Sequence, residues 1–493
     1  MIEWQTELIS WQALYITVAL YSIGASCLIL LDNKPAKSAI AWLLTLNLLP
    51  FIGLVFYILA GVNWKRYRIL KQRPEELFSS QLQPLLHRQK TFIRQIKDED
   101  ESDIQKSIHL LLNSNHAVVT LNNRCEIFHH GSLLFADLKE KLENARQFIH
   151  MEYYIWKSDK LGQEIKDILI RKAREGVEVR LIFDGVGCFW AMTRAYKQEL
   201  EEAGINYRIF LNPLTPVGGL FANYANHRKL VVIDGHFAYV GGMNLAEEYI
   251  TGGDHFHYWR DTHLRLEGEA AQMLQAIFAT DWVNSGGHRL SESHYFPTVE
   301  MTPHFHPDDP ETLPIQIACS GPDSDWHTIK QHFFNVIINA NRCVYIQSPY
   351  FIPDESIMSA LEITALSGIE VHLMITGRPD RLIPYWAAET YFEAFLKAGG
   401  RLYRYRRGFL HCKTLIVDDY ISSVGTCNMD IRAFELNYEV NAVIYDRDVA
   451  DTLRNQFLLD LQDCEEITLA RLARMPLWKR LRNGFLKILS PLL

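Results

Sequence analysis

Two stretches of the chain carry the same set of residues that could do chemistry. Residues 226–244 read NHRKLVVIDGHFAYVGGMN, and residues 410–428 read LHCKTLIVDDYISSVGTCN. Both contain the spacing H-x-K-x4-D, with an asparagine 17 residues after the histidine. One such motif arises easily by chance, whereas two copies with similar flanks indicate a common site. The motif residues are His227, Lys229, Asp234 and Asn244 in the first copy, and His411, Lys413, Asp418 and Asn428 in the second.

The histidine and lysine of each motif suit a phosphate group. Residues 230–233 and 414–417 are aliphatic or β-branched, which predicts a buried strand in each copy. Residues i and i+2 of a strand share a face, so each motif histidine points into the same space as its lysine. The lysine would neutralise an anion while the neutral histidine attacks phosphorus or passes a proton.

The motif aspartates have a different position. Asp234 and Asp418 lie seven residues after their histidines, an odd offset that would turn them to the opposite face. Each is followed by a residue typical of turns, Gly235 or Asp419. We include both aspartates in the predicted catalytic set, but expect them to hold a turn and not to touch their own histidine.

A histidine that acts as nucleophile needs a carboxylate on its second ring nitrogen. Asp261 lies 34 residues after His227, and Glu439 lies 28 residues after His411. The sequence therefore predicts Asp261 and Glu439 as the orienting groups of their respective motifs. The alternative is that these carboxylates form salt bridges near Arg260 and Arg432.

One histidine as nucleophile and one as general acid are enough for covalent phosphoryl transfer without a metal or cofactor. The chain has no G-x-S-x-G elbow and no Walker A loop. Its eight cysteines are scattered without a C-x-x-C pair, which favours reduced thiols facing the cytoplasm over disulfides or a metal site.

The order of elements around the motifs is also repeated. Residues 148–155 resemble 344–351, and residues 176–182 resemble 368–374. Strand-like and helix-like patterns alternate from about residue 106 onward. We predict an α/β fold of two homologous domains packed as a pseudo-dimer. The expected domains are 106–290 and 314–465, joined by a proline-rich linker at 291–313.

The N-terminus predicts a membrane anchor. Residues 10–31 and 38–62 lack charged side chains, and each stretch is long enough to cross a hydrocarbon core as a helix. The alternative is a pair of buried core helices. Five basic residues at 65–73 follow the second stretch, against two in the connecting loop, which places both the N-terminus and the large C-terminal part in the cytoplasm.

Two further segments have a biased composition. Residues 64–105 begin basic and end acidic, and we interpret them as a juxtamembrane linker. Residues 466–493 form a basic, amphipathic tail, suited either to an anionic membrane surface or to packing on the domain with its basic face outward. The net charge of −8 argues against a general nucleic-acid partner.

The paired motifs resemble those of the phospholipase D superfamily. The N-terminal hairpin and four further segments are similar to bacterial cardiolipin synthases, namely YWRD at 258–261, SGPD at 320–323, SPYF at 348–351 and LNYE at 436–439.

The resemblance implies an inner-membrane enzyme that condenses two phosphatidylglycerol molecules to cardiolipin and glycerol through a phosphatidyl-histidine. It also implies His227 as nucleophile and His411 as acid and base, although the residues alone are symmetric. The alternatives are a hydrolytic phospholipase D and a transphosphatidylase that uses another alcohol.

Overall fold

The computed structural model describes residues 2–32, 36–50, 102–215, 223–297 and 313–488, together with the single positions 53, 54, 57, 61 and 89. The chain divides into two compact units. The first comprises Met1–Ile69 and Pro213–Asn223, and the second comprises Leu70–Asn212 and Tyr224–Leu493. Because the second contains both predicted catalytic motifs, we call it the catalytic unit. Most of the predicted linker at 64–105, and residues 298–312 of the predicted linker at 291–313, lie outside the described residues.

The first unit contains helices α1 (Ile2–Leu31) and α2 (Ala36–Leu48). They share a small apolar cluster in which Trp42 meets Tyr57 edge to face, with ring centroids 5.2 Å apart. Within the described ranges, no helix combines the length and apolarity needed to cross a bilayer. The structure therefore does not show the two spans predicted at 10–31 and 38–62, and part of the second lies outside the described residues.

The catalytic unit is built on two sheets with the same central strand order. The first sheet runs β2 (Asn123–Phe128), β10 (His263–Gly268), β8 (Phe237–Gly241), β7 (Lys229–Ile233), β3 (Phe148–Tyr153), β4 (Glu178–Asp184), β5 (Asn206–Phe210). The second runs β1 (Val119–Thr120), β11 (Ile315–Ser320), β20 (Asn437–Tyr445), β18 (Ile421–Gly425), β17 (Thr414–Val417), β12 (Cys343–Gln347), β14 (Glu370–Thr376), β15 (Arg401–Tyr405), β21 (Cys464–Ile467). Each motif occupies a central strand, β7 or β17.

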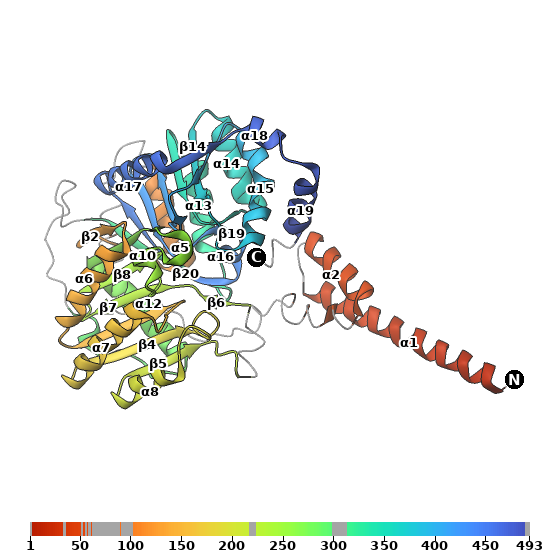
Figure 1. Ribbon diagram of the computed structural model, residues 1–493, viewed down its shortest axis with the longest axis horizontal. Helices are drawn as coiled ribbons and strands as arrows, with labels where there is room; N and C mark the ends of the chain where they lie inside the picture. The colour runs from red at the N-terminus through yellow and green to blue at the C-terminus, as the bar shows by residue number, and fades with distance from the viewer. Residues whose placement is uncertain are drawn as a thin grey trace. The chain divides into compact units, whose positions relative to one another are not determined.

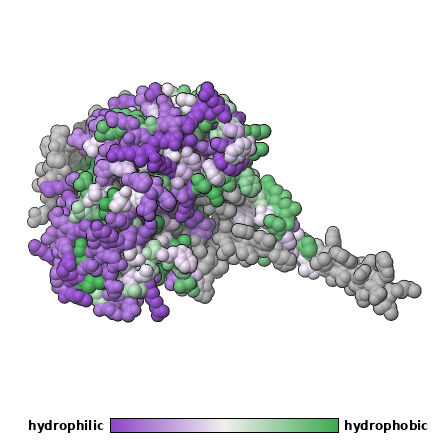
Figure 2. Space-filling view, in the orientation of Figure 1, coloured by the Kyte–Doolittle hydropathy of each residue, from purple (hydrophilic) through white to green (hydrophobic). Residues whose placement is uncertain are grey.

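Helices cover the outer face of each sheet (Figure 1). The first sheet packs on α6 (Gly131–Glu143), α7 (Lys160–Arg174) and α8 (Arg194–Glu202). The second packs on α5 (Ser102–Asn115), α13 (Thr328–Ile338), α14 (Glu355–Leu366) and α15 (Leu382–Lys397). The surface of the catalytic unit that Figure 2 shows is mainly hydrophilic, as expected for helices that bury one apolar face.

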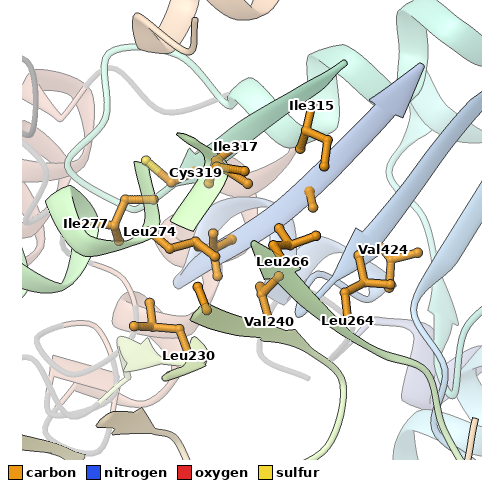
Figure 3. Packing of buried hydrophobic residues seen from close by; sticks show 14 of the residues in the cluster. Leu230, Val240, Leu264, Leu266, Leu274, Ile277, Ile315, Ile317, Cys319 and Val424 are labelled. Atoms are coloured by element: carbon orange, nitrogen blue, oxygen red, sulfur yellow. The ribbon is translucent and has the colours of Figure 1, made fainter. Parts of the chain in front are cut away.

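A third core joins the two halves. Leu230 and Val232 of β7 point into this core, whereas Val231 and Ile233 point to the outer helices, so both faces of the strand are buried. Figure 3 shows Leu230, Val240 and Leu266 of the first sheet packed with Ile317 and other residues of the second half. Helices α12 (Glu269–Asn284) and α17 (Arg447–Asp460) complete the core between the halves.

The structure confirms an α/β fold with two repeated halves and corrects three details. Residues 102–120, which the sequence assigns mostly to the first domain, pack on the second half through α5 and through the pairing of β1 with β11. Strand β21 extends the second sheet to Ile467, beyond the predicted end at 465. The predicted match of residue 148 with 344 is wrong by one position, because Phe148 and Cys343 accept the equivalent backbone bonds from Asp234 and Asp418. The eight cysteines all lie among the described residues, and none of them forms a disulfide.

The motif aspartates hold turns, as the turn residues that follow them predict. Asp234 and Asp418 have positive φ angles of 53° and 54°. The Asp234 carboxylate accepts hydrogen bonds from the backbone N–H groups of residues 146, 147 and 148 at 2.8, 2.8 and 2.9 Å. Asp418 accepts the equivalent bonds from residues 341, 342 and 343 at 2.6, 2.7 and 3.0 Å. Each aspartate thus ties the turn after its motif strand to the start of the neighbouring strand.

We expect Asp234→Ala to destabilise the protein by about 2–3 kcal/mol, because three N–H groups lose a charged acceptor and alanine tolerates a positive φ poorly. Asp234→Asn should lose less, since asparagine keeps an acceptor oxygen and accepts this backbone conformation. Thermal unfolding in detergent measures both. Equal midpoints of thermal unfolding for Asp234→Ala and the unmodified chain would show that this turn does not depend on the Asp234 carboxylate.

Candidate active site

The two motif histidines line one cavity. His227 follows the short strand β6 (Ala225–Asn226), and His411 follows β16 (Phe409–Leu410). Both are only 8% exposed, and both border a cavity of about 610 Å³ formed by residues of the two halves. The predicted convergence of the two motifs on one site is therefore present in the fold.

Each histidine is held by a carboxylate of the opposite half. The Nδ1 atom of His227 lies 3.0 and 3.1 Å from the two carboxylate oxygens of Glu439. The Nδ1 atom of His411 lies 2.7 Å from Oδ2 of Asp261. The sequence identifies the two carboxylates but assigns them within each half, and that pairing is wrong. The alternative also fails for Arg260, whose guanidinium meets Asp460 at 2.9 Å.

Backbone hydrogen bonds of the two histidines also cross to the opposite half. The N–H of His227 donates to the carbonyl of Tyr438 at 3.0 Å, and the N–H of His411 donates to that of Arg260 at 2.7 Å. Strand β6 pairs with β20, and β16 pairs with β9 (Trp259–Arg260). Tyr438 thus fixes the backbone of His227, and its neighbour Glu439 orients the ring of the same histidine. Arg260 and Asp261 do the same for His411.

Both motif lysines are buried beside the histidines. Lys229 Nζ donates to the carbonyl of His227 at 2.6 Å, and Lys413 Nζ donates to that of His411 at 2.5 Å. Burial lowers the pKa of Lys229 to about 7, and it also lowers the pKa of Lys413. Because burial destabilises both ammonium groups, an anion that enters the cavity would be strongly favoured.

The surroundings keep the imidazoles neutral. Burial and then the charge of Lys229 hold the pKa of His227 well below its ordinary value. Burial and then Lys413 lower the pKa of His411 to about 4, although Asp261 works in the other direction. A neutral ring whose Nδ1–H is held by a carboxylate has its lone pair on Nε2, which is the form needed for nucleophilic attack.

The two carboxylates differ in their environment. Burial raises the pKa of Glu439 to about 7. Burial also acts to raise the pKa of Asp261, but the charge of Lys413 and the contact with His411 outweigh it, so this pKa lies below its usual value. The two halves are therefore similar in geometry and unequal in electrostatics.

The motif asparagines also border the cavity. Asn244 accepts from the N–H of Ile155 at 3.1 Å and donates to the hydroxyl of Tyr249 at 2.7 Å, so both ends of its amide are fixed. The Oδ1 atom of Asn428 is buried without a hydrogen-bond partner among the described residues. The amide of Asn244 is therefore a fixed part of the cavity wall. The side-chain oxygen of Asn428 can still accept a hydrogen bond.

Sequence reasoning missed the residues that support the carboxylates. Gly242 lets Asp261 approach, because a Cβ there would lie 2.0 Å from Oδ1 of Asp261. The equivalent position in the second half is Thr426, whose hydroxyl donates to Glu439. The difference is visible in the sequence, where residues 241–244 read GGMN and residues 425–428 read GTCN. Its effect on the carboxylate can be understood only once the carboxylate of the opposite half is placed beside it.

Two buried ion pairs underlie the site and were also missed. Arg228, directly after His227, pairs with Asp281 of α12, and its Nε donates to the carbonyl of Glu439 at 3.4 Å. Arg260, directly before Asp261, pairs with Asp460 of α17. Each pair anchors the segment that carries either a motif histidine or an orienting carboxylate.

The cavity has an aromatic side next to His411. The rings of Trp259, Phe409 and Tyr249 have centroids 5.7, 5.7 and 5.8 Å from that of His411. Near His227 the wall includes Tyr154, whose ring centroid is 4.8 Å away, and the cavity is also bordered by cationic residues of the second half, Arg381 and Arg432. Within the described ranges, no group of three or more His, Cys, Asp or Glu is arranged to hold a metal ion.

The exchanged contacts can be tested with histidine NMR. Asp261→Asn removes a charge that raises the pKa of His411, so this pKa should fall further while that of His227 changes little. Glu439→Gln should instead alter the signals of His227. Chain labelled at histidine Cε1 and titrated in detergent would show both, assigned with His227→Ala and His411→Ala. A response of His227 to Asp261→Asn would favour pairing within each half.

The fold and the site agree with comparisons to known proteins. A family model described as "Cardiolipin synthase, PLD-like domain" matches residues 138–282 and 333–461, and one described as "Phospholipase_D-nuclease N-terminal" matches residues 19–61. The chain belongs to the cardiolipin synthase family of the phospholipase D superfamily.

Relatives match along nearly the whole chain. The chain is 40% identical to the major cardiolipin synthase of Bacillus subtilis (strain 168), over 94% of this chain and 95% of that protein. It is 36% identical to a cardiolipin synthase of Halalkalibacterium halodurans, over 99% of this chain and 95% of that protein. A phosphatidylserine synthase of Haemophilus influenzae has a similar fold, with a TM-score of 0.60, 16% identity, and coverage of 79% of this chain and 100% of that chain.

Proposed function

We propose that the protein is a cardiolipin synthase, which transfers a phosphatidyl group between two phosphatidylglycerol molecules and releases glycerol. The similarity to cardiolipin synthases over nearly the full length supports this substrate. The observation that carries the mechanism is the pair of histidines on one cavity, each held through Nδ1 by a carboxylate of the other half.

In the first half-reaction, Nε2 of His227 attacks the phosphorus of one phosphatidylglycerol. The bond from phosphorus to the glycerol headgroup oxygen breaks, and a protonated His411 gives its proton to the leaving oxygen. The products are glycerol and a phosphatidyl group bound covalently to His227. The negative phosphodiester itself favours the protonated form of His411, because an anion nearby stabilises the imidazolium.

In the second half-reaction, a terminal hydroxyl of a second phosphatidylglycerol replaces the departed glycerol. His411 takes the proton of this hydroxyl, its oxygen attacks phosphorus, and the bond from phosphorus to Nε2 of His227 breaks. Cardiolipin leaves, and His411 is again protonated. The two steps are chemically alike, so the transfer is reversible.

The surrounding residues position the two histidines and neutralise the charge of the phosphate group. Lys229 and Lys413 offset the charge that develops on the phosphoryl oxygens, and they act strongly because the site is buried. Glu439 orients His227, and Asp261 orients His411. Asn244 and Asn428 line the space for the phosphodiester. Asp234 and Asp418 act only through the turns that they hold.

The aromatic side of the cavity favours a lipid acceptor over water. Trp259, Phe409 and Tyr249 stand beside His411, the group that would deprotonate the acceptor. Apolar rings at this position exclude water and receive the apolar part of a second lipid. A lipid hydroxyl then reaches the intermediate more readily than a water molecule does.

A membrane location follows from the substrates and the N-terminal sequence. The uncharged stretches at 10–31 and 38–62 would form two spans in the bacterial inner membrane, with the N-terminus and the catalytic unit in the cytoplasm. Residues 19–61, which cover most of these stretches, match the N-terminal domain described above. A tethered enzyme meets lipid at a high effective concentration.

Product analysis tests the proposed activity. Purified full-length protein in phosphatidylglycerol micelles should form cardiolipin and glycerol in equal amounts, because each transfer releases one headgroup. A chelator should leave the rate unchanged, since the proposed steps use only imidazole and ammonium groups. Phosphatidic acid with glycerol as the main products would show a hydrolase, and transfer to an added alcohol in preference to phosphatidylglycerol would show a different transphosphatidylase.

The roles of the histidines can be separated with phosphatidylglycerol labelled in its phosphate. Both His227→Ala and His411→Ala should reduce cardiolipin formation by about a thousandfold or more, as expected for a nucleophile and its proton donor. His411→Ala should retain a slowly formed, acid-labile label on the protein, whereas His227→Ala should retain none. Label on His227→Ala but not on His411→Ala would exchange the two roles.

A further inference from the structure

The C-terminal helices form a basic segment on the catalytic unit. Helix α18 spans Leu469–Ala473 and α19 spans Leu477–Ile488. After Ile467 the sequence contains no Asp or Glu. Its six cationic residues are Arg471, Arg474, Lys479, Arg480, Arg482 and Lys487.

One side of α19 is docked on α15. Asn483 is buried, and its Nδ2 donates to Glu389 of α15 at 2.7 Å. The guanidinium of Arg482 lies over the ring of Trp386 at 3.9 Å, and Leu486 packs against the outer core of the second sheet. These contacts hold α19 in a defined orientation, so its remaining side is a fixed surface.

That remaining side is apolar and exposed. Leu477, Trp478, Leu481 and Phe485 are each between 61% and 72% exposed. Their spacing places them on one side of the helix. Figure 2 shows hydrophobic residues at the edge of the catalytic unit where α19 lies. Removal of such side chains from water is favourable, so four of them together favour a partner that covers them.

The charges indicate what this partner is. Lys479 and Arg482 each lie 5.5 Å from the ring centroid of Trp478, so positive charge borders the apolar row. An apolar row flanked by cations, with no acidic residue on the segment, matches the headgroup region of an anionic bilayer. Trp478 is also the type of side chain that favours the interface between water and hydrocarbon. A protein partner would need an apolar groove with an acidic rim.

We propose that α19 lies in the surface of an anionic membrane, with Leu477, Trp478, Leu481 and Phe485 inserted among the lipids. The same helix α15 that carries α19 also borders the catalytic cavity through Pro384, directly after the exposed Leu382 and Ile383. Contact of α19 with lipid would therefore bring one wall of the cavity close to the bilayer. This link to catalysis rests on the proposed function, whereas the lipid contact does not.

Fluorescence quenching tests the lipid contact without any use of activity. Full-length protein and Trp478→Phe would be reconstituted in vesicles of brominated phosphatidylcholine, with and without phosphatidic acid, which is anionic but has no phosphodiester to transfer. The difference between the two proteins isolates Trp478. Its emission should be quenched by about half or more when phosphatidic acid is present, and less without it. Absence of quenching of Trp478 in the anionic vesicles would overturn the proposal.

Activity then tests the consequence for catalysis. Leu481→Glu/Phe485→Glu should reduce cardiolipin formation from vesicles by about tenfold, because two carboxylates oppose insertion at an anionic surface. Its rate with monomeric short-chain phosphatidylglycerol should stay within about twofold of the unmodified chain. Leu133→Glu, at another exposed leucine on α6, is the matched control and should leave both rates unchanged.

The outcomes separate the two proposals. An unmodified protein that forms no cardiolipin from either substrate would contradict the proposed function and leave the quenching result standing. A double variant that works normally on vesicles would overturn the role of α19. A double variant that fails equally on the short-chain lipid would also overturn it, because the defect would then lie in the fold or the cavity.

Discussion

The hydrogen bonds that cross between the two halves are the interaction on which this site depends. Each histidine takes its carboxylate and its backbone partner from the opposite half, through Glu439 with Tyr438 and through Asp261 with Arg260. Neither half alone could set the tautomer of its own histidine. The packing between the sheets therefore acts directly on the chemistry, because a small shift between them would move both rings away from their carboxylates.

Burial makes these exchanged contacts effective. Two lysines, two histidines and two carboxylates lie together away from water, where each charge acts more strongly than it would at the surface. The cost of this arrangement appears in the pKa values, since burial depresses those of both lysines and of both histidines. An anionic phosphodiester would relieve this cost. The site is thus already organised for an anionic group.

The two halves have diverged in how they support the same geometry. In the first motif the residue directly after the histidine is Arg228. The equivalent residue in the second motif is Cys412. The residue directly before the orienting carboxylate is Arg260 in the first half, before Asp261. It is Tyr438 in the second half, before Glu439. The arginines of the two ion pairs under the site therefore both come from the first half. The motif histidines and lysines and the orienting carboxylates are arranged symmetrically, whereas the residues behind them are not. This asymmetry gives the two similar histidines different surroundings.

The sequence predicted a large share of this protein. The aliphatic runs after each histidine predicted buried strands, and the turn residues Gly235 and Asp419 predicted turns at Asp234 and Asp418. These are local features, set by the period of a strand and by turn chemistry. Errors appeared where the answer depended on distant contacts. Residues 102–120 belong to the second half by packing alone, and the register of residue 148 is fixed by a bond from Asp234.

By itself the sequence determined which side chains could do the chemistry, namely His227, Lys229, His411 and Lys413 with the carboxylates Asp261 and Glu439. It also determined that there are two copies of the fold. Only the tertiary structure decided which carboxylate serves which histidine, and that Gly242 and Thr426 make room for or bind that carboxylate. The physical reason is that a motif specifies its own strand, whereas partners more than 100 residues apart are chosen by how two apolar sheets pack together.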